Sequence, residues 1–339
     1  MSQNDLLALL QRWRNASIDQ VRPWAAQLSQ RPWVLKAGMV LVALRIILWT
    51  NRALTNYSLN NWTRIRAWSN EHELVLVTGG CSGIGKQIVS GLAERGVRVV
   101  VLDIQEPVFS FGTNVTFYHA DVTSSESIRA VAQKIRASHG EPTVLVNNAG
   151  VGNEGTLLAK SEARIRQTFE INTISHFLMV REFLPAMIKQ NHGHIVTIAS
   201  TASFMGMGEM MDYSCSKASA LAFHEGLSEE IRSWYKAPNI RTSIIHPNWV
   251  RTPMITTLTS AGDRFRQPIL TPKEVADAVV KQILAQKSGQ VVLPGHLKPL
   301  SWLRALPFWI QGAVRGAAAR SLKSVTDWQK QTKQNVGSP

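Results

Sequence analysis

The sequence has few cysteines. Its 339 residues contain only Cys81 and Cys215, which cannot form a disulfide framework and therefore fit a reducing compartment. Neither cysteine has companion histidines and cysteines at metal-ligand spacing, so we predict no metal site. Internal repeats and long low-complexity segments are also absent. This length suits one large α/β domain with appendages.

Acidic residues are scarce in two flanking regions. The chain carries 37 Lys and Arg against 23 Asp and Glu, a formal net charge of +14. Residues 1–70 contribute +7 and residues 298–339 contribute +6, whereas residues 71–297 carry only +1. Nine of the eleven tryptophans also lie in the flanks. Because Trp with Lys and Arg is typical of a membrane interface, this distribution favours a membrane surface over nucleic acid as the partner.

The first flank contains a long apolar run, VLKAGMVLVALRIILW (Val34–Trp49). Its two cations, Lys36 and Arg45, lie near the ends, where long side chains reach the lipid headgroups. We predict a membrane segment at about residues 33–50, either spanning or lying in the membrane. The alternative is an amphipathic helix packed on the protein itself. The second flank predicts an interfacial helix, with packing onto the core as the alternative.

Between the flanks, short β-branched runs alternate with helical stretches. The predicted strands are Leu74–Thr78, Val97–Asp103, Val115–Ala120, Thr143–Asn147, His194–Ser200, Ile240–His246 and Gln290–Leu293. The predicted helices follow Gly83 and cover Ser124–Ser138, Ser161–Lys189, Tyr213–Tyr235 and Pro272–Gln286. Near-continuous apolar strands separated by helices predict a single α/β domain over residues 71–297, a doubly wound parallel sheet of the Rossmann type. Such a sheet binds ligands at the carboxyl ends of its strands.

The first predicted strand leads into a glycine-rich turn, TGGCSGIG. Gly79, Gly83 and Gly85 lie between strand and helix, where the bare backbone can approach a pyrophosphate and the helix N-terminus offers N–H groups. Asp103 ends the next strand 18 residues after Gly85, near where an acid binds the ribose hydroxyls of NAD. Since a carboxylate there would repel a 2′-phosphate, NAD is favoured over NADP. The alternative is a tight turn in which Asp103 caps a loop.

The stretch YSCSK places Tyr213 four residues before Lys217 within a predicted helix. One helical turn brings the two side chains to the same face. A nearby cation stabilises the phenolate and lowers the tyrosine pKa from its ordinary value of about 10. Tyr213 could then exchange a proton with an alcohol or a ketone. Taken alone, the pair could equally be two polar residues on a helix surface.

Six segments in chain order resemble the short-chain dehydrogenase/reductase family, across about residues 73–295. They are TGGCSGIG (Thr78–Gly85), DV (Asp121–Val122), NNAG (Asn147–Gly150), IN (Ile171–Asn172), IAS ending at Ser200, and YSCSK (Tyr213–Lys217). The resemblance implies an NAD(P)-dependent oxidoreductase acting on CH–OH groups. Membrane-anchored hydroxysteroid and retinol dehydrogenases are the most similar in pattern, because they too carry an apolar N-terminal extension.

The resemblance implies a role for each matching residue. Tyr213 would be the catalytic acid or base, and Ser200 would position the substrate oxygen. Lys217 would hold the nicotinamide ribose, with Asn172 supporting a water relay behind it. The implied cofactor-binding residues are Gly79, Ser82, Gly83, Ile84, Gly85, Asp103, Asp121, Val122, Asn148, Gly150, Tyr213, Lys217 and Thr252. Asn248 departs from the family, which more often has glycine at that position.

Apolar residues follow Ser200. Phe204, Met205, Met207, Met210 and Met211 predict an adaptable wall for a lipophilic ligand, with core packing or a subunit contact as alternatives. The loop from Pro253 to Pro268 is the predicted lid. Its apolar residues are Met254, Ile255, Leu258 and Phe265, while Asp263, Arg264 and Arg266 are expected to face water.

These features predict an NAD-dependent dehydrogenase acting on a lipophilic alcohol or ketone, such as a sterol, a retinoid or a long-chain alcohol. We expect it at the endoplasmic reticulum or a lipid droplet, with the catalytic domain in the cytosol. The resemblance also implies a homodimer through the helices near Ser161 and Tyr213. The alternatives are an NADP-dependent ketoreductase of the same fold and a non-catalytic nucleotide-binding scaffold at a membrane or lipid droplet.

Overall fold

The computed structural model describes residues 32–64, 66–262, 265 and 267–336. Some predictions fall outside the described residues, namely those on Asp263, Arg264 and Arg266 and on two of the nine flanking tryptophans, Trp13 and Trp24. The chain forms two compact units, a first unit of residues 1–58 and a second unit of residues 59–339. The division into residues 1–70, 71–297 and 298–339 stays a prediction.

Helix α3 (Pro32–Leu59) contains the predicted membrane segment. It is longer than residues 33–50, because no proline or glycine follows Gly38 to end it sooner. Among the described residues this is the one helix long and apolar enough to cross a membrane, with 25 residues at a mean hydropathy of 1.4. At about 1.5 Å per residue, that length exceeds the roughly 30 Å hydrocarbon core of a bilayer.

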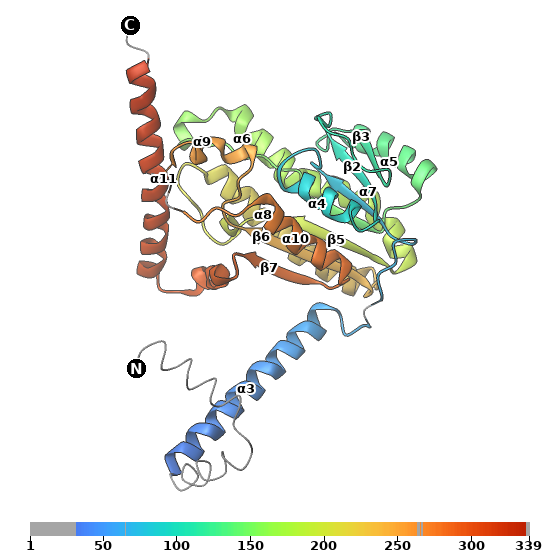
Figure 1. The fold of residues 1–339 in the computed structure, drawn as a ribbon, viewed down its shortest axis with the longest axis horizontal. Helices are drawn as coiled ribbons and strands as arrows, with labels where there is room; N and C mark the ends of the chain where they lie inside the picture. The colour runs from blue at the N-terminus through green and yellow to red at the C-terminus, as the bar shows by residue number, and fades with distance from the viewer. Residues whose placement is uncertain (1–31, 65, 263–264, 266, 337–339) are drawn as a thin grey trace, which may run out of the picture. The chain divides into compact units, whose positions relative to one another are not determined.

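The second unit is built on a seven-stranded parallel sheet in the order β3-β2-β1-β4-β5-β6-β7 (Figure 1). The strands are β1 (Leu74–Thr78), β2 (Arg98–Asp103), β3 (Val115–His119), β4 (Val144–Asn147), β5 (Gly193–Ile198), β6 (Ile240–Pro247) and β7 (Gly289–Leu293). All seven predicted strands and the doubly wound sheet are confirmed. The chain runs outward in opposite directions from β1 and β4, so the crevice between these two strands opens at their carboxyl ends.

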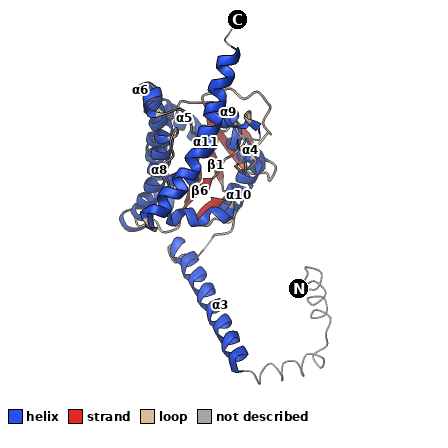
Figure 2. Ribbon diagram, turned by 90° about the vertical axis from the view of Figure 1, so that its left-hand side faces the viewer, coloured by secondary structure: helices blue, strands red, loops and turns tan. Residues whose placement is uncertain are grey.

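Helices cover both faces of the sheet. They are α4 (Gly83–Ala93), α5 (Ser125–His139), α6 (Glu162–Phe169), α7 (Ser175–Gln190), α8 (Met211–Glu229), α9 (Thr256–Thr259) and α10 (Pro272–Leu284). Helices α4 and α10 pack on one face, while α5, α7 and α8 pack on the other. Figure 2 shows α4 and α10 on one side of the strands and α5 and α8 on the other. The sheet is therefore the middle of three layers, buried on both faces as parallel sheets are.

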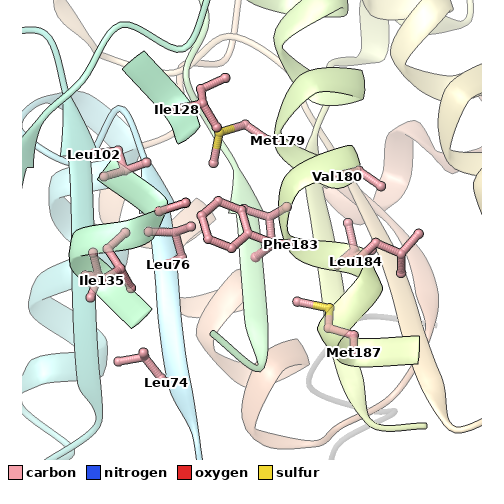
Figure 3. Packing of buried hydrophobic residues seen from close by; sticks show 14 of the residues in the cluster. Leu74, Leu76, Leu102, Ile128, Ile135, Met179, Val180, Phe183, Leu184 and Met187 are labelled. Carbon is pink, nitrogen blue, oxygen red and sulfur yellow. The ribbon is translucent and has the colours of Figure 1, made fainter. Parts of the chain in front are cut away.

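The alternation of side chains along β1 explains the two cores. Leu74 and Leu76 face the layer of α5 and α7, where Phe183 is fully buried (Figure 3). Val75 and Val77 point to the opposite face and pack with the residues of α4 and α10. Because successive strand residues alternate between faces, one continuous apolar strand supplies both layers.

The predicted helix Ser161–Lys189 is interrupted in the structure. A π-helical turn, η2 (Glu170–Ile174), separates α6 from α7 and contains Asn172. Such turns often occur at functional sites, because the extra residue re-aims the neighbouring side chains. A second π turn, η4 (Glu230–Trp234), ends the predicted helix Tyr213–Tyr235.

Three short 3-10 helices lie in the loops: η1 (Leu157–Ala159) follows β4, η3 (Thr201–Ser203) follows β5, and η5 (Pro253–Ile255) precedes α9. After β7 the chain forms the 3-10 helix η7 (Gly295–Ala305) and the long helix α11 (Phe308–Val336). Pro307 lies immediately before α11, where its missing N–H costs the helix nothing. Figure 2 shows α11 crossing in front of the strands. Leu322 and Val325 of α11 are buried, so this part of the C-terminal flank packs onto the core, which is the alternative raised by the sequence.

Candidate active site

A cavity of about 480 Å³ lies at the carboxyl edge of the sheet. The predicted site residues that line it are Gly79, Ser82, Gly83, Ile84, Asp103, Asp121, Val122, Asn148, Gly150, Ser200, Tyr213, Lys217 and Thr252. The other two predicted residues, Gly85 and Asn172, lie behind the wall against Gly79 and Gly150. The structure therefore brings the whole predicted set together around one cavity.

The glycine turn after β1 is packed too closely to carry side chains. Gly79 has a φ of +66°, and a Cβ there would lie 2.9 Å from the Cα of Ala149. A Cβ on Gly85 would lie 2.0 Å from the carbonyl oxygen of Gly79. The side-chain amide of Asn148 donates to the carbonyl oxygens of Thr78 and Gly79, at 2.9 and 3.0 Å. These contacts fix the turn so that its backbone faces the cavity.

Asp103, at the end of β2, is fixed by backbone groups. Its Oδ2 accepts a hydrogen bond from the Cys81 N–H at 2.9 Å, and its Oδ1 accepts one from the Gln105 N–H at 3.0 Å. Burial and the nearby Asp103 carboxylate raise the pKa of the Cys81 thiol to about 12. The thiol therefore stays protonated beside the Asp103 carboxylate.

Asp121 lies beside Asp103 at the next strand end. Its Oδ1 accepts hydrogen bonds from the backbone N–H and the hydroxyl of Thr123, at 2.8 and 2.7 Å. Its own N–H donates to the Ser127 hydroxyl at 3.0 Å. The carboxylate is thereby held in the turn that leads into α5, at the wall of the cavity.

Tyr213 and Ser200 lie at the opposite end of this wall. Tyr213 belongs to the first turn of α8, and the Ser200 hydroxyl is close enough to influence its pKa. The Ser200 hydroxyl donates to the Pro247 carbonyl at 3.3 Å and accepts from the Ala202 N–H at 3.2 Å. The backbone therefore holds the Ser200 hydroxyl from two sides.

Lys217 lies one helical turn after Tyr213 and is buried. Its ammonium donates to the carbonyl oxygen of Ile198 at 2.9 Å. Burial lowers the pKa of Lys217 to about 8. Burial also raises the pKa of Tyr213, and the nearby Ser200 hydroxyl offsets part of that increase. The expected lowering of the tyrosine pKa by Lys217 is wrong for this structure, because the desolvation of the phenolate is the larger effect.

Asn172 supports the wall behind Lys217. Its Oδ1 accepts from the Val151 N–H at 2.8 Å, and its Nδ2 donates to the Val151 carbonyl at 2.8 Å and to the Ser216 hydroxyl at 3.0 Å. A Cβ on Gly150 would lie 3.3 Å from Asn172 Oδ1 and 3.5 Å from Lys217 Nζ. Both groups thus converge on Gly150, while the water relay stays a prediction.

His246 is a site residue that the sequence analysis did not identify. Its Nδ1–H donates to the Ser200 carbonyl at 3.0 Å, and its Nε2 accepts from the Gln290 amide at 3.2 Å. Its ring packs against Phe204, with 4.5 Å between the ring centres. Burial lowers the pKa of His246 to about 4, so the ring is neutral at pH 7. The one sign of this residue in the sequence was a histidine at the end of a predicted strand.

The start of α8 is fixed by a buried ion pair that the sequence analysis also missed. Lys160 pairs with Asp212, the residue before Tyr213, and their side chains are 5% and 3% exposed. Lys160 also donates to the Asn153 carbonyl at 2.6 Å, and the Thr168 hydroxyl donates to Asp212 at 3.1 Å. The pair joins the loop after β4 to the helix that carries Tyr213.

The far end of the cavity is apolar. Its lining includes Met207, Met210, Trp249, Met254 and Ile255. The predicted wall is therefore only partly present. Met211 is 50% exposed, because α8 begins there and turns its side chain away from the cavity. Phe204 is buried against His246, and Met205 does not line the cavity.

The predicted lid packs against the C-terminal helix. Ile255, Leu258 and Phe265 are buried in one cluster with Leu322 and Val325 of α11. The ring of Phe265 meets Trp249 edge to face, with 5.2 Å between the ring centres. The C-terminal helix therefore backs the substrate end of the cavity.

Asn248 fits its position without strain. Its Oδ1 accepts from the Thr201 hydroxyl at 3.1 Å, and its N–H donates to the Leu293 carbonyl at 2.8 Å. Asn248 is not among the residues with positive φ, so its backbone does not require glycine. The neighbouring Thr252 approaches the glycine turn, where a Cβ on Gly83 would lie 3.2 Å from its methyl group.

The site combines a glycine turn at a sheet crevice with a serine, a tyrosine and a lysine on one cavity wall. This combination defines a class of nucleotide-dependent oxidoreductases. The comparisons with known proteins agree. Residues 73–262 match the family model described as short chain dehydrogenase. The chain belongs to the short-chain dehydrogenase/reductase family, whose members act on alcohol and ketone groups.

Two relatives and one solved structure illustrate what this chain is similar to. It is 41% identical over 210 residues to Dehydrogenase RED2 of Cochliobolus heterostrophus, covering 61% of this chain and 79% of that protein. It is 35% identical over 245 residues to Estradiol 17-beta-dehydrogenase 11 of Macaca fascicularis, covering 69% and 79%. A 3-ketoacyl-(acyl-carrier-protein) reductase from Brucella melitensis, solved with NADH, superposes with a TM-score of 0.60 at 21% identity, covering 66% and 98%. This last similarity supports the fold.

Proposed function

We propose that the protein transfers hydride between NAD(H) and a lipophilic alcohol or ketone, with Tyr213 as the catalytic acid or base. The observation that carries this proposal is a single cavity whose lining combines three groups of residues. They are Asp103 with the glycine turn, Tyr213 with Ser200, and the apolar residues around Met207. A surface suited to a cofactor, a proton donor and an apolar surface thereby meet in one cavity, as the reaction needs.

The cofactor would lie along the glycine turn. Gly79 and Gly83 leave the backbone bare beside the N-terminus of α4, which favours a pyrophosphate. Asp103 would accept hydrogen bonds from the adenosine ribose and would oppose a 2′-phosphate, which favours NAD. NAD supplies the nicotinamide ring that takes hydride from, or returns it to, the carbinol carbon.

Proton transfer would use Tyr213. In oxidation its phenolate removes the proton from the substrate hydroxyl, and in reduction its phenol donates the proton to the carbonyl oxygen. The Ser200 hydroxyl would hold the same oxygen by a hydrogen bond. Lys217, one helical turn after Tyr213, would hold the nicotinamide ribose.

The apolar wall supports a lipophilic substrate of the sterol, retinoid or long-chain alcohol class. Methionines and Trp249 present a pliable surface that is suited to such molecules. A relative named Estradiol 17-beta-dehydrogenase 11 is consistent with this class. Helix α3 fits an enzyme that stays at the membrane in which its substrate dissolves.

We place the protein at the endoplasmic reticulum or a lipid droplet, with the catalytic domain of residues 71–297 in the cytosol. The flanks of residues 1–70 and 298–339 would associate with the lipid surface. A homodimer through α7 and α8 is part of the proposal, since Phe177 on α7 is 46% exposed beside Phe223 on α8.

The test is cofactor reduction by the purified protein in detergent. NAD and NADP are each offered with sterols, retinol and long-chain alcohols, and Tyr213→Phe is measured beside the parent. We expect turnover with NAD that disappears in the variant. In Asp103→Asn, which keeps an acceptor for the Cys81 N–H, the preference for NAD over NADP should fall about tenfold. Bound NADH without turnover of any substrate would favour a non-catalytic scaffold instead.

A further inference from the structure

The C-terminal segment carries three large aromatic side chains in water. Trp302, Phe308 and Trp309 are 73%, 78% and 75% exposed, and they lie within eight residues of one another in the sequence. We name these three residues the aromatic patch. Single exposed apolar residues are ordinary, but several large ones in a short segment indicate a surface that binds a partner.

The charged residues that flank the aromatic patch in the sequence have one sign. From Gly295 to Thr326 the sequence contains five Lys and Arg and no Asp or Glu. Lys298, near the start of this stretch, is exposed. Tryptophan prefers the headgroup depth of a bilayer, and the cations would meet anionic lipid there. The patch thus matches a lipid surface in both its apolar and its charged groups.

A second copy of the chain fits this surface less well. In a symmetric dimer the same patch would face itself, which would bring the two sets of five cations together. Helix α3 also favours lipid as the partner, because it is long and apolar enough to cross a bilayer.

The segment that bears the patch is fastened to the substrate end of the cavity. Arg304 lies between Trp302 and Phe308, and its guanidinium donates to the carbonyl oxygens of Ser203 and Phe204, each at 3.3 Å. Both carbonyls follow Ser200 closely in the chain. Farther along the same segment, Leu322 and Val325 pack with the predicted lid, and the Thr326 hydroxyl donates to the Glu209 carboxylate at 2.6 Å.

We propose that the aromatic patch docks the second unit on a lipid surface, and that the attached segment presents the substrate end of the cavity to that lipid. A lipophilic substrate then enters from the lipid without crossing water. The docking is inferred from the aromatic patch and does not depend on the proposed reaction. The delivery of substrate rests on the proposed function, so the two parts need separate measurements.

Docking is tested by quenching tryptophan fluorescence with lipid. The full chain is reconstituted into vesicles of phosphatidylcholine and phosphatidylserine that carry bromine on their acyl chains. We compare the parent with the double variant W302F and W309F, and with Trp234→Phe as the matched control. Trp234 is 70% exposed and belongs to η4, outside the C-terminal segment of the sequence. The remaining tryptophans contribute equally to all three proteins.

The direction in which the quenched fraction of tryptophan fluorescence changes tests the docking. If Trp302 and Trp309 contact lipid, removing them lowers the quenched fraction, whereas removing the water-exposed Trp234 raises it. A rise in both variants would overturn the docking. Phenylalanine keeps the apolar character of the patch, so the parent and both variants should insert alike. This measurement needs no turnover and stands even if the proposed reaction is wrong.

Delivery is tested by kinetics with the triple variant W302S, F308S and W309S, with Trp234→Ser as its control. We expect kcat/KM for a long-chain alcohol dissolved in vesicles to fall about tenfold in the triple variant, while kcat/KM for a short water-soluble alcohol stays unchanged. Equal losses on both alcohols would show that the patch serves the fold and would overturn the proposal. Loss of a cross-linked dimer in the triple variant would assign the patch to a second copy instead.

Discussion

The two ends of the cavity are built in different ways. At the cofactor end, the glycine turn, Asp103 and Asn148 hold one another through backbone atoms of neighbouring strands. At the substrate end, Met210, Ile255 and Leu322 meet as side chains of segments more than 40 residues apart in the sequence. The cofactor end has no room for a side chain at Gly85, because a Cβ there would collide with a carbonyl oxygen. The substrate end is ordinary apolar packing.

This difference teaches where substitutions should act. Changes at the cofactor end should affect all substrates equally, because every reaction uses the same cofactor. Changes at the substrate end should distinguish one substrate from another. Tyr213, Ser200 and Lys217 lie where the two ends meet, so their loss should affect the chemical step itself.

The largest effect is expected at this junction. Tyr213→Phe should lower kcat by about 10²- to 10⁴-fold, the usual contribution of a general acid or base. The affinity for NADH, measured by fluorescence titration, should stay within about twofold, since the ring remains. Tyr235→Phe removes a hydroxyl from a half-exposed tyrosine and should leave kcat unchanged. Full activity of Tyr213→Phe would remove this residue from the mechanism.

The next effect tests the tight packing of the cofactor end. In Gly85→Ala the new methyl would lie 2.0 Å from the Gly79 carbonyl oxygen. NADH affinity should fall about 10- to 100-fold, which corresponds to roughly 1–3 kcal/mol of overpacking. Gly91→Ala in the same helix is the matched control, because its methyl would meet nothing closer than 3.4 Å. Equal NADH binding in both variants would contradict the close fit of the turn.

The pH dependence of stability follows from the buried Lys217. Burial lowers its pKa from 10.5 to about 8, so between pH 8 and pH 10 the unfolded chain binds more protons than the folded chain. The contribution of Lys217 to the free energy of unfolding should therefore rise with pH across this window, by about 2 kcal/mol at most. Cys81 and Tyr213 act in the opposite direction, because burial raises the pKa of each. Urea unfolding at both pH values should therefore show a stability difference, parent minus Lys217→Met, that grows by about this amount from pH 8 to pH 10. The exposed Lys189→Met should behave like the parent. An unchanged difference would exclude Lys217 as the group responsible.

The smallest effect is expected at the substrate end. Leu322→Ala opens space behind the lid, and KM for a lipophilic alcohol should rise roughly threefold, less than 1 kcal/mol. Leu92→Ala, which truncates a buried leucine near the C-terminal end of α4, should lower the thermal stability without this selective change in KM. If Leu322→Ala altered NADH affinity instead, the two ends would not be independent.

The cofactor end could be predicted from the sequence because each of its parts is contiguous. A strand, a glycine turn and a helix follow one another in the chain, and parallel pairing then brings Asp103 and Asn148 to the same edge. The sheet was predicted for the same reason, since fully buried strands such as β1 read as continuous apolar runs.

The substrate end could be predicted only in part, because its contacts join distant segments. Nothing near Ile255 indicates that Leu322 will pack on it. Periodicity also could not show that α8 begins at Met211, and this start separates the lining Met210 from the exposed Met211. The desolvation that reverses the expected pKa shift of Tyr213 depends on burial, which appears only after the fold has formed.

The most direct test of the account is hydride transfer from NADH that carries deuterium on its reactive carbon. The parent and Tyr213→Phe are each mixed with a lipophilic ketone, and the alcohol product is examined by mass spectrometry. We predict that the parent places deuterium on the carbinol carbon, while the variant binds NADH equally well and forms almost no product. Equal deuterium transfer by both proteins would contradict the role of Tyr213.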